Sequence, residues 1–275
     1  MSFDLNGPLV LAGAGKMGGA LLIGWLSKGL NPDDIIVVDP APPPEVATIL
    51  EQNRVRCVPA LPKLEKPPAV LLMAVKPQIM DDVFGKLATA AGPGTVVISI
   101  AAGRTLASFE KRLNPGAAVI RTMPNTPAAI GRGITVCKAN AHTTKQQRAL
   151  CEALLSAVGE VGWVEDEALI DAVTAVSGSG PAYVFLLAEC MAQAGVEAGL
   201  DPDLAMRLAR ATISGSGELM RQSPAITPAA LRQNVTSPGG TTAAALSVLM
   251  ADDDGLQQLM TQAVLAATAR GRELA

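Results

Sequence analysis

The stretch PLVLAGAGKMG (residues 8–18) decides the fold. An apolar run leads into the pattern Gly-x-Gly-x-x-Gly, and the helical pattern GGALLIGWLSKG follows at once. In a strand–turn–helix setting, Gly13 makes the tight turn, Gly15 lets the backbone approach a pyrophosphate, and Gly18 lets helix and strand pack closely. The loop Gly13, Ala14, Gly15, Lys16, Met17, Gly18 therefore predicts a dinucleotide-binding turn. The alternative is a strand-to-helix turn with incidental glycines.

The rest of the first half repeats this alternation of strand and helix. Further apolar runs, hydrophobic on both faces as in a covered parallel sheet, read IIVVD, AVLLMAV, TVVISIAAG and AAVIRTMPN, and the segments between them suit crossover helices. The pattern predicts an α/β protein with a Rossmann-type doubly wound sheet. We place this dinucleotide-binding domain at residues 1–164.

After Val161 no further run has the pattern of a strand, and several positions indicate where helices begin. Gly180-Pro181, Asp201-Pro202 and Thr227-Pro228 each place a proline where a helix can begin without losing a needed N–H. We expect an all-helical domain at residues 165–275. Thr143 and Gln146 have the spacing of a capping box ahead of QRALCEALLSAVG, which predicts a helix start there.

Asp39 ends the second predicted strand, 26 positions after Gly13. A carboxylate at this place can accept from the ribose 2′-hydroxyl of NAD, and it would repel the 2′-phosphate of NADP. The following residues 40–44 carry no basic or hydroxyl side chain, although Arg54 and Arg56 could approach from the next strand. The alternative is that Asp39 only caps the following turn.

Two more segments lie where predicted strands end. One is Ala74, Val75, Lys76 and Pro77, and the other is MPNTP around Asn125. Ligands of open α/β sheets collect beyond the carboxyl ends of the strands, so both segments can line the nicotinamide end of a cofactor. Alternatively, each proline only terminates a strand.

The tail carries an unusual segment, QNVTSPGGTTAAAL (residues 233–246), within an otherwise helical pattern. A helix–helix turn needs fewer glycines and hydroxyls than this. Backbone N–H groups freed by Gly239 and Gly240, with the hydroxyls of Ser237, Thr241 and Thr242 at a helix start, can form an anion cradle without a charged residue. The alternative is a well-capped turn.

The amino-acid composition limits which kinds of partner are expected. The chain has 22 basic and 25 acidic residues with no basic run, so neither nucleic acid nor an anionic membrane is an expected partner. Four cysteines without metal spacing and one histidine, His142, predict no metal site; we read the cysteines as buried thiols of a reducing compartment and His142 as a surface residue.

No export signal is evident, and the run 182–188 is too short to span a bilayer, so a cytoplasmic location is expected. The apolar helix 181–198 suggests a homodimer.

A resemblance to a known family is carried by the segments GAGKMGGAL (13–21), AVKPQ (74–78), RTMPNTPA (121–128), VTAVSGSGPAYVF (173–185) and LRQNVTSPGGTT (231–242). The chain resembles the pyrroline-5-carboxylate reductase family over nearly its whole length. The resemblance implies reduction of 1-pyrroline-5-carboxylate to L-proline, the last step of proline synthesis, with NADPH or NADH. It further implies a helical domain that interlocks with a partner subunit, and dimers that assemble further, commonly into decamers.

The resemblance also assigns roles to residues. It implies that the segment 237–242 receives the substrate carboxylate, that Thr242 lies beside the ring nitrogen, and that residues 13–18, Lys76, Pro77 and Asn125 hold the cofactor. The chain departs from many members at Asp39 and the prolines after it, which supply no small polar or basic group for a 2′-phosphate. Cofactor preference therefore stays open.

Two other functions fit part of this pattern. A β-hydroxyacid dehydrogenase shares the plan but needs a lysine in the first helix of the second domain, and PAYVFLLAECMAQAG has none. A non-catalytic NAD-sensing protein would need only the glycine loop, and the segment 237–242 argues against it.

Overall fold

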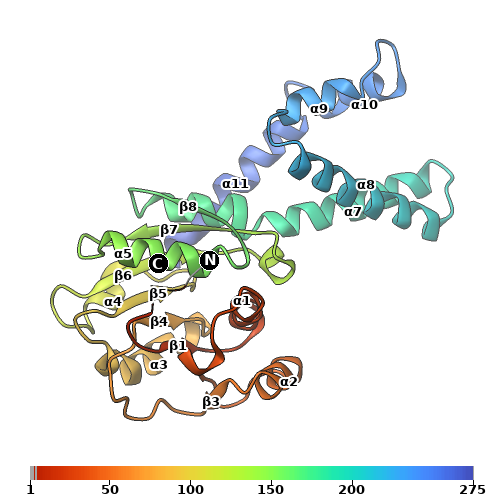
Figure 1. Ribbon diagram of the computed structural model, residues 1–275. Coiled ribbons are helices and arrows are strands. Elements are labelled where there is room, and N and C mark those ends of the chain that lie inside the picture. The colour runs from red at the N-terminus through yellow and green to blue at the C-terminus, as the bar shows by residue number, and fades with distance from the viewer. Residues whose placement is uncertain (1–2, 4, 275) are drawn as a thin grey trace. The chain divides into compact units, whose positions relative to one another are not determined.

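A computed structural model describes residue 3 and residues 5–274 of the chain. Contacts divide it into two compact units, Met1–Gly178 with Ala267–Ala275, and Ser179–Ala266 (Figure 1). The first unit contains the sheet and the second is built from helices. The last strand ends at Trp163, and in the described residues every later element is a helix. The fold class expected from the sequence is confirmed. The functional division after residue 164 stays a prediction.

The sheet has eight strands in the order β3-β2-β1-β4-β5-β6-β7-β8. The strands are β1 (Leu9–Ala12), β2 (Ile35–Val38), β3 (Arg56–Val58), β4 (Val70–Met73), β5 (Val96–Ser99), β6 (Ala118–Met123), β7 (Gly133–Ala139) and β8 (Gly159–Trp163). From β3 through β6 all neighbours are parallel, as the apolar runs predict. β7 pairs with β6 antiparallel, and β8 continues parallel to β7. These last two strands lie beyond the apolar runs identified in the sequence, and β7 turns back antiparallel because residues 124–132 are too few for a crossover connection.

Helices cover both faces of the sheet. The helices of the first unit are α1 (Lys16–Ser27), α2 (Pro44–Gln52), α3 (Met80–Leu87), α4 (Leu106–Glu110), α5 (Lys145–Leu155) and α6 (Leu169–Val173), with short 3₁₀ turns η1 (Pro32–Asp34), η2 (Pro77–Ile79), η3 (Ala88–Ala90) and η4 (Thr126–Ile130). One buried cluster joins α1, α2 and α5 to alternate strand residues, including Trp25 and Leu154. The other joins α3 and α4 to the remaining strand residues, around an edge-to-face contact of Phe84 and Phe109 at 4.9 Å. Burial on both faces explains the near-continuous apolar strands.

The start of α5 corrects one expectation. The capping box is formed by Thr144 and Gln147, one residue later than the predicted pair Thr143 and Gln146. Thr144 Oγ1 accepts from Gln147 N, and Gln147 Oε1 accepts from Thr144 N. Thr143 instead donates its hydroxyl to Asn140 Oδ1 at 2.8 Å. Two adjacent threonines offer the same spacing, and the bond to Asn140 selects the second one for the cap.

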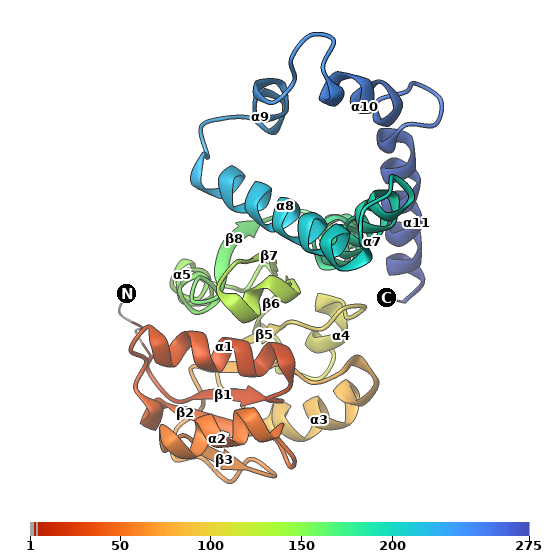
Figure 2. The same cartoon turned by 90° about the vertical axis from the view of Figure 1, so that its right-hand side faces the viewer.

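The second unit contains α7 (Gly180–Glu197), α8 (Pro202–Gln222), α9 (Pro228–Asn234), α10 (Thr241–Leu249) and most of α11 (Leu256–Glu273). The predicted proline starts of α7, α8 and α9 are confirmed. Asp201 caps α8 by accepting from two backbone N–H groups, and Thr227 caps α9. α7 and α8 pack side by side (Figures 1 and 2).

Much of the apolar surface of α7 remains uncovered in the single chain. Phe185 is 63% exposed and Leu186 is 58% exposed, with Val184, Leu187 and Met191 also exposed. In the described residues, the helical run Leu169–Glu197 has the length and mean hydropathy, 1.3, of a membrane span, and core helices of soluble proteins and signal sequences share these properties. An apolar face of this extent marks an interaction surface.

Candidate functional site

The glycine loop has the geometry that its sequence predicts. Gly13 has φ +92°, a conformation that L side chains rarely adopt. A Cβ on Gly18 would overlap Gly13 O and lie 3.3 Å from Ala74 Cβ, so any side chain there would push α1 away from the loop and from the end of β4. Both glycines are therefore required by the backbone itself.

The loop also leaves room for a ligand. A Cβ built on Gly15 would meet no protein atom within 4 Å. Gly15 is the N-cap of α1, and no side chain caps this helix. The start of α1 therefore combines N–H groups that no side chain caps with the positive end of the helix dipole, which suits a pyrophosphate. The residues present fit a dinucleotide.

Asp39 follows β2 and belongs to the same loop cluster. Its Oδ2 accepts from Ala14 N at 2.7 Å, and its Oδ1 accepts from Ala41 N at 2.9 Å. The bond from Ala14 N holds the glycine loop against Asp39. The bond from Ala41 N caps the turn after β2, which is the role that the alternative interpretation gives to Asp39. A carboxylate oxygen can accept more than one hydrogen bond, so a ribose hydroxyl can still be received.

β3 runs directly beside Asp39, because Asp39 N donates to Val58 O at 3.0 Å and Cys57 Sγ lies 3.7 Å from Asp39 O. Arg56 pairs with Ile36, three residues before Asp39, which places the Arg56 backbone about 10 Å from that end of β2, and Arg54 lies farther back in the chain. Arg56 directly precedes Cys57, so the backbone geometry leaves open the approach of an arginine from β3 that the sequence suggests. Burial raises the pKa of the Cys57 thiol, and the charge of Asp39 raises it further.

The segment Ala74–Pro77 lies directly beside the glycine loop. Ala74 N donates to Ala12 O at 2.7 Å, and a Cβ on Gly13 would lie 2.9 Å from Ala74 O. Lys76 is exposed and is the N-cap of η2, whose Pro77 O accepts from Arg104 Nη2 at 2.9 Å. The structure thus brings together the first two predicted cofactor segments.

Asn125, at the end of β6, has both ends of its amide engaged. Its Oδ1 accepts from Ile134 N at 2.9 Å, and its Nδ2 donates to Ser177 Oγ at 3.2 Å. Ser177 belongs to a π-helical turn, Thr174–Gly178, between α6 and α7. Ser177 had no predicted role of its own; it lies between Val176 and Gly178 in the motif VTAVSGSGPAYVF, and this motif was the available signal.

The segment 237–242 in the second unit forms a tight turn into α10. Gly239 has φ +69°, Gly240 N donates to Ser237 O at 3.1 Å, and a Cβ on Gly240 would overlap Ser237 Oγ. Gly240 is the N-cap of α10, and no side chain caps the helix. Thr241 and Thr242 are its first two residues, so the first turn combines free N–H groups with hydroxyls.

Arg121 forms a buried ion cluster that the sequence did not predict. Its side chain is 3% exposed; Nη1 lies 3.0 Å from Glu167 Oε1, and Nη2 lies 3.5 Å from Asp171 Oδ1. Glu167 Oε1 also accepts from Leu106 N at 2.8 Å. The cluster connects β6 and the start of α4 to α6 and to the segment that leads into it. Because this segment continues into the π-helical turn of Ser177, the cluster helps to fix the position of that turn.

The four cysteines and the histidine lie in different surroundings. Cys137 and Cys151 are buried, and burial raises the pKa of Cys151 well above its usual range. Cys57 and Cys190 are exposed, contrary to the expectation that all four are buried, because β3 is the edge strand and this face of α7 is uncovered. His142 lies exposed in the turn before α5. In the described residues no cluster of His, Cys, Asp and Glu side chains could hold a metal ion.

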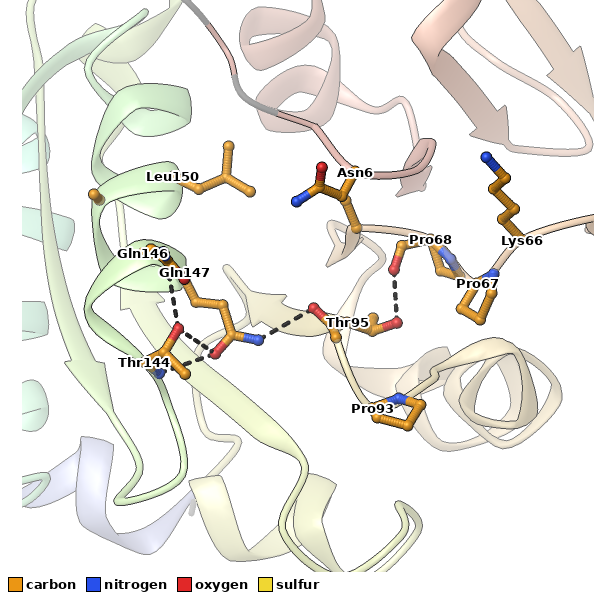
Figure 3. A pocket seen from close by; sticks show the side chains of 13 residues that line it. Asn6, Lys66, Pro67, Pro68, Pro93, Thr95, Thr144, Gln146, Gln147 and Leu150 are labelled. Atoms are coloured by element: carbon orange, nitrogen blue, oxygen red, sulfur yellow. Dashed lines mark hydrogen bonds between the residues drawn. The ribbon is translucent and has the colours of Figure 1, made fainter.

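A hollow of about 670 Å³ lies at the opposite edge of the sheet, before β4 and β5 (Figure 3). Two of its polar side chains bond within the chain: Thr95 Oγ1 donates to Pro68 O, and Gln147 Nε2 donates to Gly94 O. Lys66 is its one charged lining residue. It is therefore separate from the predicted site, which lies at the carboxyl ends of the strands.

Comparisons with known proteins match both parts of the chain. A family model described as "Pyrroline-5-carboxylate reductase dimerisation" matches residues 167–274, and one described as "NADP oxidoreductase coenzyme F420-dependent" matches residues 9–103. Pyrroline-5-carboxylate reductase from Pseudomonas aeruginosa is 41% identical over 97% of this chain and 96% of its own length. The enzyme of that name from Synechocystis is 42% identical over 97% of each chain.

Solved structures agree with these matches. A pyrroline-5-carboxylate reductase from Coxiella burnetii superposes with a TM-score of 0.89 and 32% identity over 98% of both chains. A pyrroline carboxylate reductase from Plasmodium falciparum, solved with NADP bound, gives a TM-score of 0.79 and 26% identity, again over 98% of both chains. The similarity is thus continuous across the glycine loop, the π-helical turn and the segment 237–242.

Proposed function

This chain belongs to the pyrroline-5-carboxylate reductase family, and we propose how its residues divide the work of the reaction. The chain is an oxidoreductase that reduces 1-pyrroline-5-carboxylate to L-proline in proline biosynthesis, with NADPH or NADH as the hydride donor. The main support for this function is the match to pyrroline-5-carboxylate reductases over nearly the full chain, which includes both the glycine loop and the turn at 237–242. The lysine of a β-hydroxyacid dehydrogenase is absent from α7, which agrees with this assignment.

We propose that residues 13–18 hold the pyrophosphate, Asp39 meets the adenosine ribose, and Ala74, Val75, Lys76, Pro77 and Asn125 line the nicotinamide end. The open space above Gly15 and the uncapped start of α1 support the first of these roles. The bound nicotinamide supplies the hydride. What remains for the chain is to hold the substrate, to align its C=N bond, and to exclude water.

For the substrate we propose the turn Ser237–Thr242, of which Ser237, Gly239, Gly240 and Thr241 would hold the carboxylate. The free N–H groups at the start of α10 support this role, because they can bind an anion without a charged side chain. A cyclic imine is basic enough to arrive protonated, so no strong acid is required of the protein. Thr242 then orients the ring nitrogen or donates to it.

We also propose that residues 165–275 bind substrate and form the dimer, that dimers assemble into a larger oligomer such as a decamer, and that the protein works in the cytoplasm. The dimerisation-family match and the exposed apolar face of α7 support a second copy of this chain, rather than a lipid, as the partner of that face. Sedimentation showing only monomer at micromolar concentration would contradict this part.

The direct test is oxidation of each reduced cofactor with 1-pyrroline-5-carboxylate, followed by absorbance of the nicotinamide. We expect turnover with proline as product and a higher kcat/KM with NADH, because Asp39 places a negative charge where a 2′-phosphate would lie. A preference for NADPH would overturn only the role of Asp39. Absence of oxidation with either cofactor would overturn the function itself.

Thr242→Ala tests the substrate turn. If Thr242 donates to or orients the ring nitrogen, its loss should lower kcat/KM. We expect a decrease equivalent to about 1–3 kcal/mol of transition-state binding, with an unchanged Tm. Thr48→Ala is a matched control, because Thr48 is an exposed helical threonine in α2 whose hydroxyl donates to Pro44 O. Unchanged kinetics of the Thr242 variant would remove this residue from the reaction.

A further inference from the structure

Two polar side chains distant in sequence meet at the carboxyl edge of the sheet. Asn125 follows β6, and Ser177 lies in the π-helical turn Thr174–Gly178. The 3.2 Å bond from Asn125 Nδ2 to Ser177 Oγ joins them, while Ile134 N holds the other end of the amide at 2.9 Å. Because both ends are held, the Asn125 side chain has a fixed orientation.

The π-helical turn packs directly on the end of β6. A Cβ on Gly178 would lie 3.5 Å from Met123 Sδ, which is ordinary van der Waals contact. β6 runs parallel to β5, and β5 to β4, so the end of β6 lies at the same edge as the glycine loop. Ser177 is thereby brought to the edge at which dinucleotides bind in such sheets.

The direction of the bond decides what Ser177 can do. Its oxygen accepts from Asn125, so its own proton must point to a different acceptor. Within the described chain, the Ser177 hydroxyl donates to no protein acceptor, and the residue is only half-buried. Single π-helical turns within helices occur frequently at functional sites. The arrangement presents one oriented donor to a ligand.

We propose that Ser177 donates this hydrogen bond to the carboxamide oxygen of the bound nicotinamide, and that Asn125 is a positioning residue that acts through Ser177. The inference rests on the proposed function, since it requires a nicotinamide cofactor at this edge. A bond to the carboxamide fixes the rotation of the ring, and with it the direction in which C4 faces the substrate. Asn125 then contributes by aiming Ser177, with its Oδ1 held by Ile134 N and one Nδ2 proton held by Ser177.

The test compares Ser177→Ala, Asn125→Ala and the double variant with the unaltered protein. Cofactor dissociation constants are measured by calorimetry for NADH and for its thionicotinamide analogue, in which sulfur, a weak acceptor, replaces the carboxamide oxygen. We expect Ser177→Ala to weaken NADH binding about tenfold and the analogue much less. Asn125→Ala should show the same selective loss, and the double variant should be no worse than Ser177→Ala, because one bond is lost in all three.

Asn140→Ala is the matched control. Asn140, just after β7, is another asparagine tied at both ends: its Nδ2 donates to Ala117 O at 2.9 Å and its Oδ1 accepts from Val119 N at 3.2 Å. Its partners lie at the opposite end of β6, so its loss should lower Tm without changing the ratio of the two cofactor affinities.

Three results would overturn the inference: equal losses for both cofactors in Ser177→Ala, unchanged affinity in that variant, or additive losses in the double variant, which would mean that Asn125 contacts the cofactor itself. Calorimetry needs no turnover, so these results remain distinct from a failure of the unaltered protein to reduce 1-pyrroline-5-carboxylate.

Discussion

Arg121→Met should destabilise the protein by about 3–5 kcal/mol, because it leaves the carboxylate of Asp171 buried without its cation. The side chain of Arg121 is 3% exposed and that of Asp171 is 12% exposed, so water cannot replace the lost guanidinium. The expected result is a large drop in Tm and in the urea midpoint, measured at one fixed protein concentration because oligomers unfold in a concentration-dependent way.

Two further variants separate the buried charge from the loss of a long side chain. Arg121→Met combined with Asp171→Asn should recover much of the stability, because no unpaired charge then remains at that position. Arg148→Met is the matched control: Arg148 lies 3.5 Å from Glu165 and 4.4 Å from the centre of the Trp163 ring, but both side chains of the ion pair are exposed, so only about 1–2 kcal/mol is expected. Equal destabilisation by the Arg121 and Arg148 variants would contradict the role of the buried cluster.

The strands of the first half could be predicted because both faces of the sheet are covered. Runs such as LVLA and IIVV are buried at every residue, and this burial requires an unbroken apolar sequence. β7 and β8 were harder: β7 alternates buried and partly exposed residues, and β8 is only partly buried and contains Gly159 and Gly162. The direction of β7 could still have been predicted, since the short connection 124–132 cannot hold a crossover.

In the candidate site, too, some features could be predicted from the sequence and others could not. The glycine loop is local in sequence, and its requirements, a positive φ at Gly13 and a missing Cβ at Gly18, are carried by residue type. The bond between Asn125 and Ser177 spans 52 residues, and the bonds of Arg121 span 46 and 50. No spacing rule predicts such pairs, because they depend on how β6 and the segment after β8 come together in the fold. The π-helical turn likewise has no local residue pattern that distinguishes it from α-helix.

Gly15→Ala should weaken cofactor binding by about 100-fold, roughly 3 kcal/mol, while leaving the fold intact. The backbone of Gly15 has φ −65°, which alanine adopts without strain, and the added Cβ would touch no protein atom within 4 Å. The methyl group would instead occupy open space at the N-cap of α1, where we place the pyrophosphate. Calorimetry with NADH measures the loss, and an unchanged Tm shows that the chain still folds.

Gly94→Ala supplies the comparison that makes this result specific. Gly94 also has no atom within 4 Å of an added Cβ, its φ is not positive, and it precedes β5 at the edge away from the glycine loop. Its variant should bind NADH as the unaltered protein does. Gly13→Ala would not serve in its place, because a positive φ and a contact of 2.9 Å with Ala74 O would disturb the backbone itself. Normal affinity in Gly15→Ala would mean that the open space above this loop does not receive the pyrophosphate, whatever the chain reduces.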